Sequence, residues 1–293
     1  MVLYQPTNGY CYNSDTHFLY NFIVENFKKY KNIKGELLDI GSGSGILGLL
    51  VSKDFEKIKL NQCEIQEIFQ FFTEKNSFTN NISSKLYKGS FLEIIFDKKF
   101  DICISNPPFY HSNVIKSENK SLKIARYNDS LPLESFIKRT ASILNSEGKF
   151  FFCYDSKQIN EILLLLNKYK FNLEALQFVH PNESKDATLV LVYAKRNSKS
   201  LTKILKPLMV FDRNGNFTQA DEKLAEKWTT EGKDGKEWTA QDVKEYRKEN
   251  NLTWHERSDM KTLDLVPQEV HGNISHHGGI AKVKSETTIR KEV

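Results

Sequence analysis

A glycine-rich loop is the first stretch of this chain whose residue types could bind a nucleotide. Gly41, Gly43 and Gly45 alternate with serines between two apolar runs, residues 37–40 and 46–50. Glycine lets the backbone approach a ligand closely because no Cβ stands in the way. A helix that starts after such a loop offers free N–H groups to that ligand. This strand–loop–helix pattern predicts the opening of a nucleotide-binding βαβ unit.

Two acidic residues narrow the class of ligand. Asp39 lies inside the first apolar run, so that the pattern reads D-x-G-x-G-x-G, and Glu64 follows the next predicted strand, residues 58–62. A carboxylate placed after that strand can hold ribose hydroxyls, although a solvated surface charge is the alternative for Glu64. NAD and FAD proteins use similar loops. The acidic pair, together with the motif described next, favours S-adenosylmethionine (SAM) as the cofactor.

The second stretch is Asn106, Pro107, Pro108 and Phe109, directly after the apolar run of residues 100–105. The exocyclic amine of adenine is a poor nucleophile because its lone pair is delocalised into the ring. A side-chain amide oxygen and a backbone carbonyl can each accept one of its N–H bonds, an aromatic ring can stack on the base, and positioning supplies most of the rate effect. In a structured nucleic acid the base must first be unstacked. The tetrapeptide therefore predicts adenine-N6 methyl transfer, although taken alone it also fits a plain turn.

A third set of residues lies towards the C-terminus. His255, Glu256, His271 and His276 belong to a segment that holds four of the seven histidines. Imidazole suits transition metals, and a bound metal ion can hold a scissile phosphate while a base activates water. These residue types could therefore hold a divalent metal ion. A histidine-rich solvated tail is the alternative.

The elements that must position these residues follow an alternating pattern. Strands are predicted over residues 36–40, 58–62, 85–88, 100–105, 149–154 and 187–194, and helices over residues 16–30, 46–53, 66–76, 133–144 and 158–169. Alternating strands and helices predict an α/β fold with a mostly parallel, doubly wound sheet. The glycine loop and the Asn106 motif both follow strand ends, so they are expected to meet in one crevice. The first helix is expected to cover that crevice, although a plain packing role is the alternative. The polar residues 111–130 are expected to form a lid or substrate clamp, with a solvated loop as the alternative.

Composition predicts two domains. Residues 1–212 carry 28 Lys and Arg against 22 Asp and Glu, a balance of +6, whereas residues 213–293 carry 14 against 15, a balance of −1. All four cysteines precede residue 213 and all three tryptophans follow it. We therefore predict domains at residues 1–212 and 213–293. The positive balance of the first suits a polyanionic partner such as nucleic acid.

The scattered cysteines lack the CxxC spacing of a zinc site, and reduced thiols are expected. No apolar run approaches the length of a membrane span, and the first residues lack the pattern of a signal peptide. We therefore expect a cytoplasmic protein without a membrane partner.

Residues 1–212 resemble the bacterial tRNA-valine adenine-N6 methyltransferase family, a group of class I SAM-dependent enzymes. Besides the two motifs, the resemblance rests on residues 3–22, 125–136 and 201–215. It implies a Rossmann-like sheet and methylation of an anticodon-loop adenine. By motif, it implies SAM binding by Asp39, Gly41, Gly43, Gly45 and Glu64 and base binding by Asn106, Pro107, Pro108 and Phe109. Ser90 stands where that family commonly has an acidic residue near the cofactor adenine, and it is also expected to bind SAM.

Residues 213–293 resemble the HNH/endonuclease VII superfamily, in particular its Trp-His-His toxin-type branch, through Trp254-His255-Glu256, residues 265–267 and the later histidines. The resemblance implies a small α+β domain of the ββα-metal type and a nucleic-acid substrate. By motif, it implies one divalent metal ion held by His255, His271 and His276, with His255 and Glu256 as catalytic residues. For a toxin it also implies an immunity protein as partner. Glu256 stands where the second histidine is usual, which puts activity in question.

Four functions remain open at this stage. The first is an adenine-N6 methyltransferase acting on tRNA with an appended nuclease-like domain. The second is a nuclease toxin, and the third is a modification–restriction fusion in which adenine methylation protects DNA from the attached nuclease. The fourth is an inert fusion partner. A related family with Asn-Pro-Pro-Tyr methylates glutamine in release factors, so the tetrapeptide does not decide the substrate.

Overall fold

A computed structural model of the chain describes all residues except 7–11, 110–130, 212–217, 257–262 and 268–293. The chain divides into two compact units. The first comprises Met1–His180 and Asp186–Leu208, and the second comprises Pro181–Lys185 and Met209–Val293. Each unit is described by itself.

The first unit is built on one mixed β-sheet. Its strands are β1 (Gly35–Ile40), β2 (Ile58–Glu64), β3 (Ser84–Lys88), β4 (Phe100–Ser105), β5 (Leu144–Asp155), β6 (Phe171–His180), β7 (Leu189–Arg196) and β8 (Lys203–Ile204), with the short β9 (Leu208–Met209) paired to β6. The strand order is β3-β2-β1-β4-β5-β7-β6-β8. Strands β3, β2, β1, β4 and β5 are parallel to one another, whereas β7 runs antiparallel to both β5 and β6.

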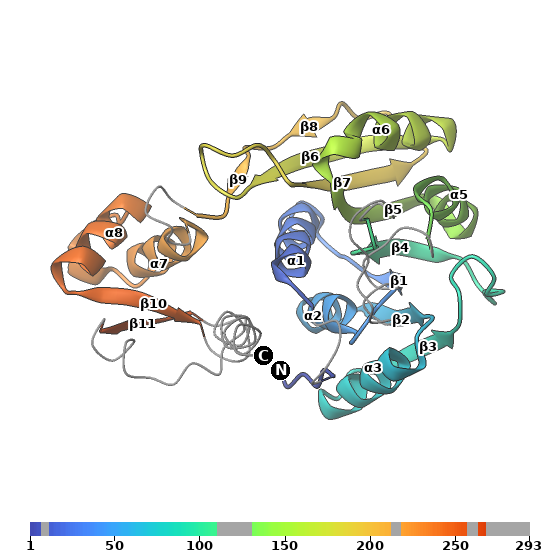
Figure 1. The fold of residues 1–293 in the computed structure, drawn as a ribbon, viewed down its shortest axis with the longest axis horizontal. Helices are drawn as coiled ribbons and strands as arrows, with labels where there is room; N and C mark the ends of the chain where they lie inside the picture. Colours follow the sequence, from blue (N-terminus) through green and yellow to red (C-terminus); the bar gives the residue numbers. More distant parts are fainter. Residues whose placement is uncertain (7–11, 110–130, 212–217, 257–262, 268–293) are drawn as a thin grey trace, which may run out of the picture. The chain divides into compact units, whose positions relative to one another are not determined.

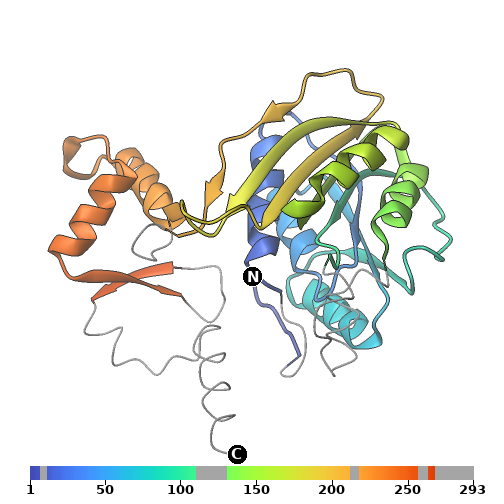
Figure 2. The same ribbon diagram turned by 45° about the horizontal axis from the view of Figure 1, so that its top comes forward.

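Helices lie on both sides of this sheet. Figure 1 shows α1 (Ser14–Phe27), α2 (Ile46–Asp54) and α3 (Glu67–Thr79) on one side, and α5 (Leu133–Ile143) and α6 (Ile159–Lys168) on the other. Helix α1 packs on α2, β5 and β7, while α5 packs on β5 and α6 on β6. Figure 2 shows β6 and β7 as a long curved pair at one end of the sheet.

The central strands form because they are continuous apolar runs, as expected for strands covered on both faces. In β5, Phe150, Phe151 and Phe152 are fully buried. The ring of Phe151 stacks on Tyr193 of β7 with centroids 4.1 Å apart, and Phe150 stacks on Phe152 at 4.6 Å. This aromatic core holds β5 rigidly beside β4, whose C-terminal end carries Asn106.

The predicted α/β class and the predicted strands are present, but the sheet is mixed rather than mostly parallel at one end. Strand β6 was absent from the prediction. Its sequence, FNLEALQFVH, is rich in residues that favour helices, and pairing with β7 outweighs that preference. Helix α1 begins at Ser14 and ends at Phe27, three residues short of the predicted end.

The second unit contains α7 (Thr218–Thr230), a short 3-10 turn (Lys233–Gly235), α8 (Ala240–Glu249) and an antiparallel hairpin of β10 (Leu252–Glu256) and β11 (Leu263–Pro267). Helix α8 begins with a capping box in which Thr239 and Asp242 exchange hydrogen bonds between side chain and backbone. Ala225, Trp238 and Val243 form the small core of this second unit. The described hairpin agrees with the first half of the predicted ββα-metal fold, and the later part of that prediction lies outside the described residues.

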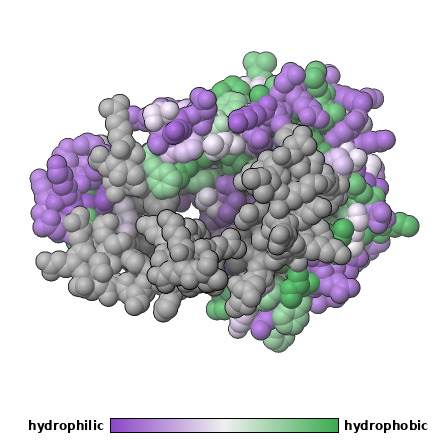
Figure 3. Space-filling view, viewed as in Figure 1, coloured by the Kyte–Doolittle hydropathy of each residue, from purple (hydrophilic) through white to green (hydrophobic). Residues whose placement is uncertain are grey.

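Hydrophobic side chains on the face drawn in Figure 3 are scattered among hydrophilic ones. Among the described residues, no helix is long and apolar enough to cross a lipid bilayer.

Candidate functional site

The glycine loop follows β1 and turns the chain into α2. Gly41, Gly43 and Gly45 all have positive φ angles, of 66°, 56° and 82°. A Cβ at Gly43 would meet nothing within 4 Å, so the backbone conformation rather than crowding requires glycine there. The loop is tied to the neighbouring strand because Gly41 and Ser42 donate their N–H groups to the carbonyl of Cys63, at 2.9 and 3.0 Å.

Asp39 lies beneath this loop and is only 1% exposed. Its Oδ2 accepts a hydrogen bond of 2.9 Å from the backbone N–H of Gly48 in the first turns of α2. Burial away from water raises the pKa of Asp39 to about 7. The carboxyl therefore anchors the start of α2 to β1 while it also lines a pocket in front of the loop.

Glu64 ends β2 and reaches back to the same loop. Its Oε2 accepts from the Gly43 N–H and its Oε1 from the Gln66 N–H, both at 2.8 Å. Burial raises the pKa of Glu64 to about 6, and these backbone hydrogen bonds oppose the rise. From α3, the Thr73 hydroxyl donates to the Gly43 carbonyl at 2.7 Å. Both sides of the Gly43 residue are thus held by side chains.

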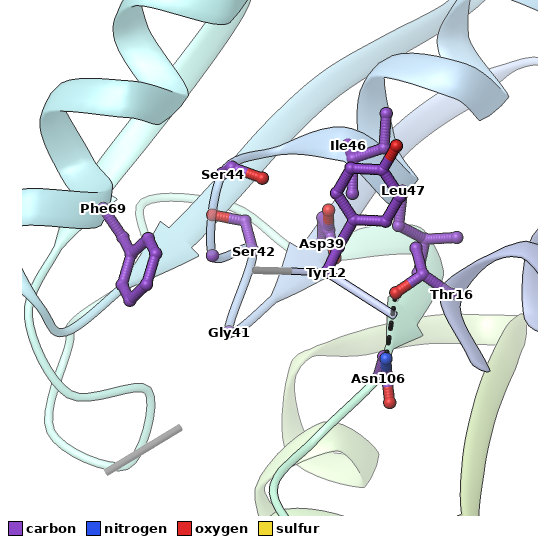
Figure 4. Close-up of a pocket in the computed structure, with 11 residues that line it drawn as sticks. Tyr12, Thr16, Asp39, Gly41, Ser42, Ser44, Ile46, Leu47, Phe69 and Asn106 are labelled. Carbon is purple, nitrogen blue, oxygen red and sulfur yellow. Dashed lines mark hydrogen bonds between the residues drawn. The ribbon is translucent and has the colours of Figure 1, made fainter. Parts of the chain in front are cut away.

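Two pockets open around the loop. Figure 4 shows the first, which lies between the glycine loop and the start of α1; its lining residues include Tyr12, Thr16, Asp39 and Asn106. The second is lined among others by Glu64, Ile65, Ser90, Phe91, Pro108 and Leu131. Gly41, Gly43, Phe69 and Asn106 line both.

This arrangement fits SAM. Sites for small ligands typically combine an apolar lining with a few convergent polar groups. The second pocket supplies a buried carboxylate, Glu64, beside apolar Ile65 and Phe91, as a ribose and an adenine ring require. The first supplies positive-φ glycine backbone and the carboxyl of Asp39. Ser90, where an acid was expected by resemblance, does line the second pocket.

Asn106 leaves β4 at the rim that the two pockets share. Its Nδ2 donates to the Thr16 Oγ1, and its Oδ1 accepts from the Cys153 thiol, each at 3.0 Å. The preceding Ser105 hydroxyl donates to the Ile40 carbonyl at 2.8 Å, which ties β4 to β1. The expected convergence of the two motifs at neighbouring strand ends is therefore present.

The other three residues of the tetrapeptide differ in whether they line a pocket. Pro108 lines the second pocket, and Pro107 is buried. Phe109 is 8% exposed, and its ring lies 5.7 Å from that of Tyr154. It is not among the residues that line either pocket, so its predicted stacking on a base stays a prediction. Gly45 also lies outside both linings, and it packs closely against Gln62.

Several residues of the site carried no sequence signal. Thr16 lies in the first turn of the helix that was expected to cover the site, and Tyr12 lies just before that helix; no motif marks either residue individually. Thr73 and Cys153 lie in ordinary helix and strand patterns, so only the tertiary structure brings them to the loop and to Asn106.

The predicted metal site is only partly described. His255 and Glu256 lie in β10, where His255 is paired in register with Asp264 of β11. His271 and His276 lie outside the described residues. Within the part of the chain that is described, no group of three His, Cys, Asp or Glu side chains could hold a metal ion. The metal ligands therefore stay a prediction.

A buried ion pair supports this hairpin. Arg247 of α8 donates through Nε and one terminal nitrogen to the two oxygens of Asp221 on α7, both at 2.7 Å. The two side chains are 5% and 6% exposed. The indole Nε1 of Trp254, the residue before His255, donates to the same carboxylate at 2.9 Å.

Comparison with known proteins agrees with both halves of this description. The methyltransferase small domain family matches residues 18–176, and the DNase/tRNase domain of colicin-like bacteriocins matches residues 193–278, a range that begins within β7. A predicted O-methyltransferase from Agrobacterium tumefaciens has a similar fold, with a TM-score of 0.52 and 17% identity over 68% of this chain and 88% of that one.

Two curated bacterial proteins are similar in sequence to the first unit. The tRNA1(Val) (adenine(37)-N6)-methyltransferase of Pedobacter heparinus is 26% identical over 53% of this chain and 67% of its own length. The release factor glutamine methyltransferase of Flavobacterium psychrophilum is 25% identical over 56% of this chain and 61% of its own length. The chain thus spans about two thirds or less of these relatives. It belongs to the methyltransferase small domain family, resembles the tRNA1(Val) adenine-N6 methyltransferases within it, and carries a colicin-like DNase/tRNase domain in its C-terminal part.

Proposed function

We propose that residues 1–212 transfer a methyl group from SAM to the N6 amine of an adenine in tRNA. The position of Asn106 carries this proposal, because its amide stands at the rim shared by the two pockets around the glycine loop. When bound, SAM supplies an electrophilic methyl group. The target amine would form an N6–carbon bond as the sulfur–carbon bond breaks, S-adenosylhomocysteine would leave, and the amine would release one N–H proton to water.

The residues of the chain have separate tasks in this proposal. Glu64 accepts hydrogen bonds from ribose hydroxyls, Ser90 contacts the adenine of the cofactor, and the glycine backbone lies against its methionine part. The Oδ1 of Asn106 and the carbonyl of Pro107 accept the two N–H bonds of the target amine and aim its lone pair at the methyl group. Because orientation supplies most of the effect, no strong base is needed. Phe109 and Pro108 confine the base.

Similarity to relatives leaves two acceptors open, because both tRNA methyltransferases and a release factor methyltransferase are similar to this chain. We propose tRNA because the second domain matches the DNase/tRNase domain of colicin-like bacteriocins. A nucleic acid is the substrate class common to both parts. The positive balance of residues 1–212 favours it over a protein.

The test measures methyl transfer from labelled SAM to bulk bacterial tRNA, duplex DNA and release factor in parallel. We expect N6-methyladenine in tRNA and a loss of at least about a hundredfold in Asn106→Ala, since a positioned acceptor is removed. Asn167→Ala, an exposed asparagine on α6, is the matched control. Label in DNA alone would favour a modification–restriction fusion, and label in glutamine would assign the chain to the release factor group.

We further propose that the C-terminal domain cleaves nucleic acid with the help of one divalent metal ion. The colicin-like match and the β10–β11 hairpin that carries His255 and Glu256 favour this second activity. His255, His271 and His276 are the proposed ligands. As a toxin, the domain would be paired with an immunity protein.

Cleavage of tRNA and DNA by the full chain, with and without a chelator, tests the nuclease. We expect the wild-type chain to cleave, and we expect His255→Ala to lose cleavage. A chelator should also abolish cleavage by the wild-type chain, and added Zn²⁺, Ni²⁺ or Mg²⁺ should then restore it. Cleavage that survives His255→Ala would exclude this site as its source.

A further inference from the structure

Both ends of the Asn106 side-chain amide are held by buried protein groups. Thr16, in the first turn of α1, is 3% exposed, and its Oγ1 accepts from Nδ2 at 3.0 Å. Cys153, near the end of β5, is fully buried, and its thiol donates to Oδ1 at 3.0 Å. These partners lie 90 residues before and 47 residues after Asn106. Three elements that are distant in sequence therefore meet at one amide.

This arrangement matters because the terminal torsion of asparagine is soft. The rotation of its amide group is broad and roughly two-fold, so an unrestrained amide exchanges its oxygen and nitrogen ends. Only the oxygen end can accept an N–H bond from a target amine. Figure 4 shows the amide nitrogen directed at the Thr16 hydroxyl, which leaves the oxygen on the other side.

The thiol is suited to the role of a fixed donor. Burial raises the pKa of Cys153 well above its ordinary value, and the nearby charge of Asp15 adds to the rise. The group therefore stays protonated and can donate its S–H. A carbonyl oxygen has two lone pairs, so a thiol that occupies one leaves the other for an incoming amine.

The backbone beneath the amide is held as well. The Ser105 hydroxyl binds the Ile40 carbonyl, and the side-chain amide of Gln158 contacts the Phe109 carbonyl at 3.5 Å. With the backbone anchored on both sides, the remaining freedom of Asn106 is the rotation of its side chain. Thr16 and Cys153 remove that freedom.

We propose that Thr16 and Cys153 are positioning residues for methyl transfer: together they clamp the Asn106 amide with its oxygen as a preoriented acceptor for the amine that receives the methyl group. This inference rests on the proposed function of Asn106. It adds two residues, from α1 and β5, that act through Asn106.

Two pairs of substitutions test the clamp kinetically in the full-length chain. We expect Cys153→Ala and Thr16→Val to lower kcat roughly ten- to a hundredfold, because a small misplacement of a positioning group has effects of that size. The KM for SAM and the thermal midpoint should change little. Cys153→Ser and Thr16→Ser, which keep a hydroxyl in place, should recover most of the rate.

Cys103 provides a matched control. It is also fully buried, on the adjacent strand β4, and is not among the residues that line either pocket. Cys103→Ala should keep the wild-type kcat. If Cys153 had a merely structural role, Cys153→Ala and Cys103→Ala would lower the thermal midpoint by the same amount and kcat by the same factor. A normal kcat in both Cys153→Ala and Thr16→Val would overturn the proposal.

A second measurement does not depend on activity. The S–H stretching band of Cys153, identified in Raman spectra by its loss in Cys153→Ala, reports whether the thiol donates a hydrogen bond. We expect the band to shift to the frequency of a free thiol in Asn106→Ala. An unchanged band would refute the clamp. If the wild-type chain methylates none of the three substrates, the proposed function fails, while this band still decides whether the clamp exists.

Discussion

Asp39 and Glu64 stand on either side of the glycine loop, and both carboxyl groups are nearly excluded from water. Burial is the main cause of the raised pKa of each, about 7 for Asp39 and about 6 for Glu64. The two groups serve different ends. Asp39 binds the backbone of α2, whereas Glu64 holds the loop and faces the larger pocket.

The protonation of Glu64 gives SAM binding a pH dependence. A carboxylate accepts ribose hydroxyls better than a carboxylic acid does, so affinity should be highest above pH 6 and fall as pH decreases through 6. Well below pH 6, each further decrease of one pH unit should weaken SAM binding up to about tenfold. Calorimetric titration with SAM between pH 5 and 8 measures this.

Glu64→Gln should bind weakly and show little pH dependence over that range. Glu67→Gln, an exposed change three residues away, is the control and should follow the wild-type curve. A Glu64→Gln curve with the wild-type slope would mean that another group causes the titration.

At the scale of elements, the Asp221–Arg247 pair joins α7 to α8 and, through Trp254, to β10. Removing one member of a buried pair leaves an uncompensated charge, which typically costs about 3–5 kcal/mol. Asp221→Ala should therefore lower the free energy of unfolding of the second unit by about that amount. All three tryptophans lie in this unit, so their fluorescence during urea unfolding reports on it selectively.

The double variant Asp221→Leu/Arg247→Met is the matched comparison. It removes both charges, and it should be more stable than Asp221→Ala because no charge is left buried alone. A double variant that is less stable than the single one would show that the hydrogen bonds, rather than the isolated charge, dominate.

A lysine side chain packs over the aromatic rings beside the small core of the second unit. The Lys233 amine lies 3.3 Å from the centroid of the Trp228 ring and 4.0 Å from that of Tyr246. Asp234, the next residue, has a φ of 57°, which is strained for a residue with a side chain. The strained backbone of Asp234 therefore belongs to the same turn that places the Lys233 amine over the rings.

Lys233→Met keeps the length of the side chain but removes its charge. We expect a loss of about 1–2 kcal/mol in the free energy of unfolding, the usual size of a cation–π contact that is partly shielded from water. Tryptophan fluorescence in urea measures it, and Lys223→Met on the exposed side of α7 is the control. Equal losses in both variants would assign the effect to net charge.

At the scale of the whole molecule, each unit has its own core and its own candidate chemistry. We therefore expect two unfolding transitions. A SAM concentration of about 100 Kd should stabilise the first unit by about 2.7 kcal/mol and leave the tryptophan transition of the second unit unchanged. Far-ultraviolet circular dichroism and tryptophan fluorescence, recorded on the same thermal scan, separate the two. A shift of equal size in both signals would show that the units unfold together.

Local patterns in the sequence determined much of the site. The glycine loop, Asp39 and Asn106 were predictable because each belongs to a short motif whose backbone geometry is set by neighbouring residues, glycines and prolines above all. Glu64 was found only by its position after a predicted strand. The strands β1 and β4 were equally clear because their apolar runs admit little else. The start of helix α8 is also determined locally, by the capping box of Thr239 and Asp242.

Only the tertiary structure decided which side chains support these motifs. Thr16 and Cys153 meet at Asn106, and Asp221 meets Arg247 and Trp254, across separations of 26 to 90 residues that no local pattern encodes. Strand β6 depended on pairing with β7 against its own helical preference. The physical reason is the same in each case: burial and long-range hydrogen bonds exist only after the chain has packed, whereas turns and caps are determined by their immediate neighbours.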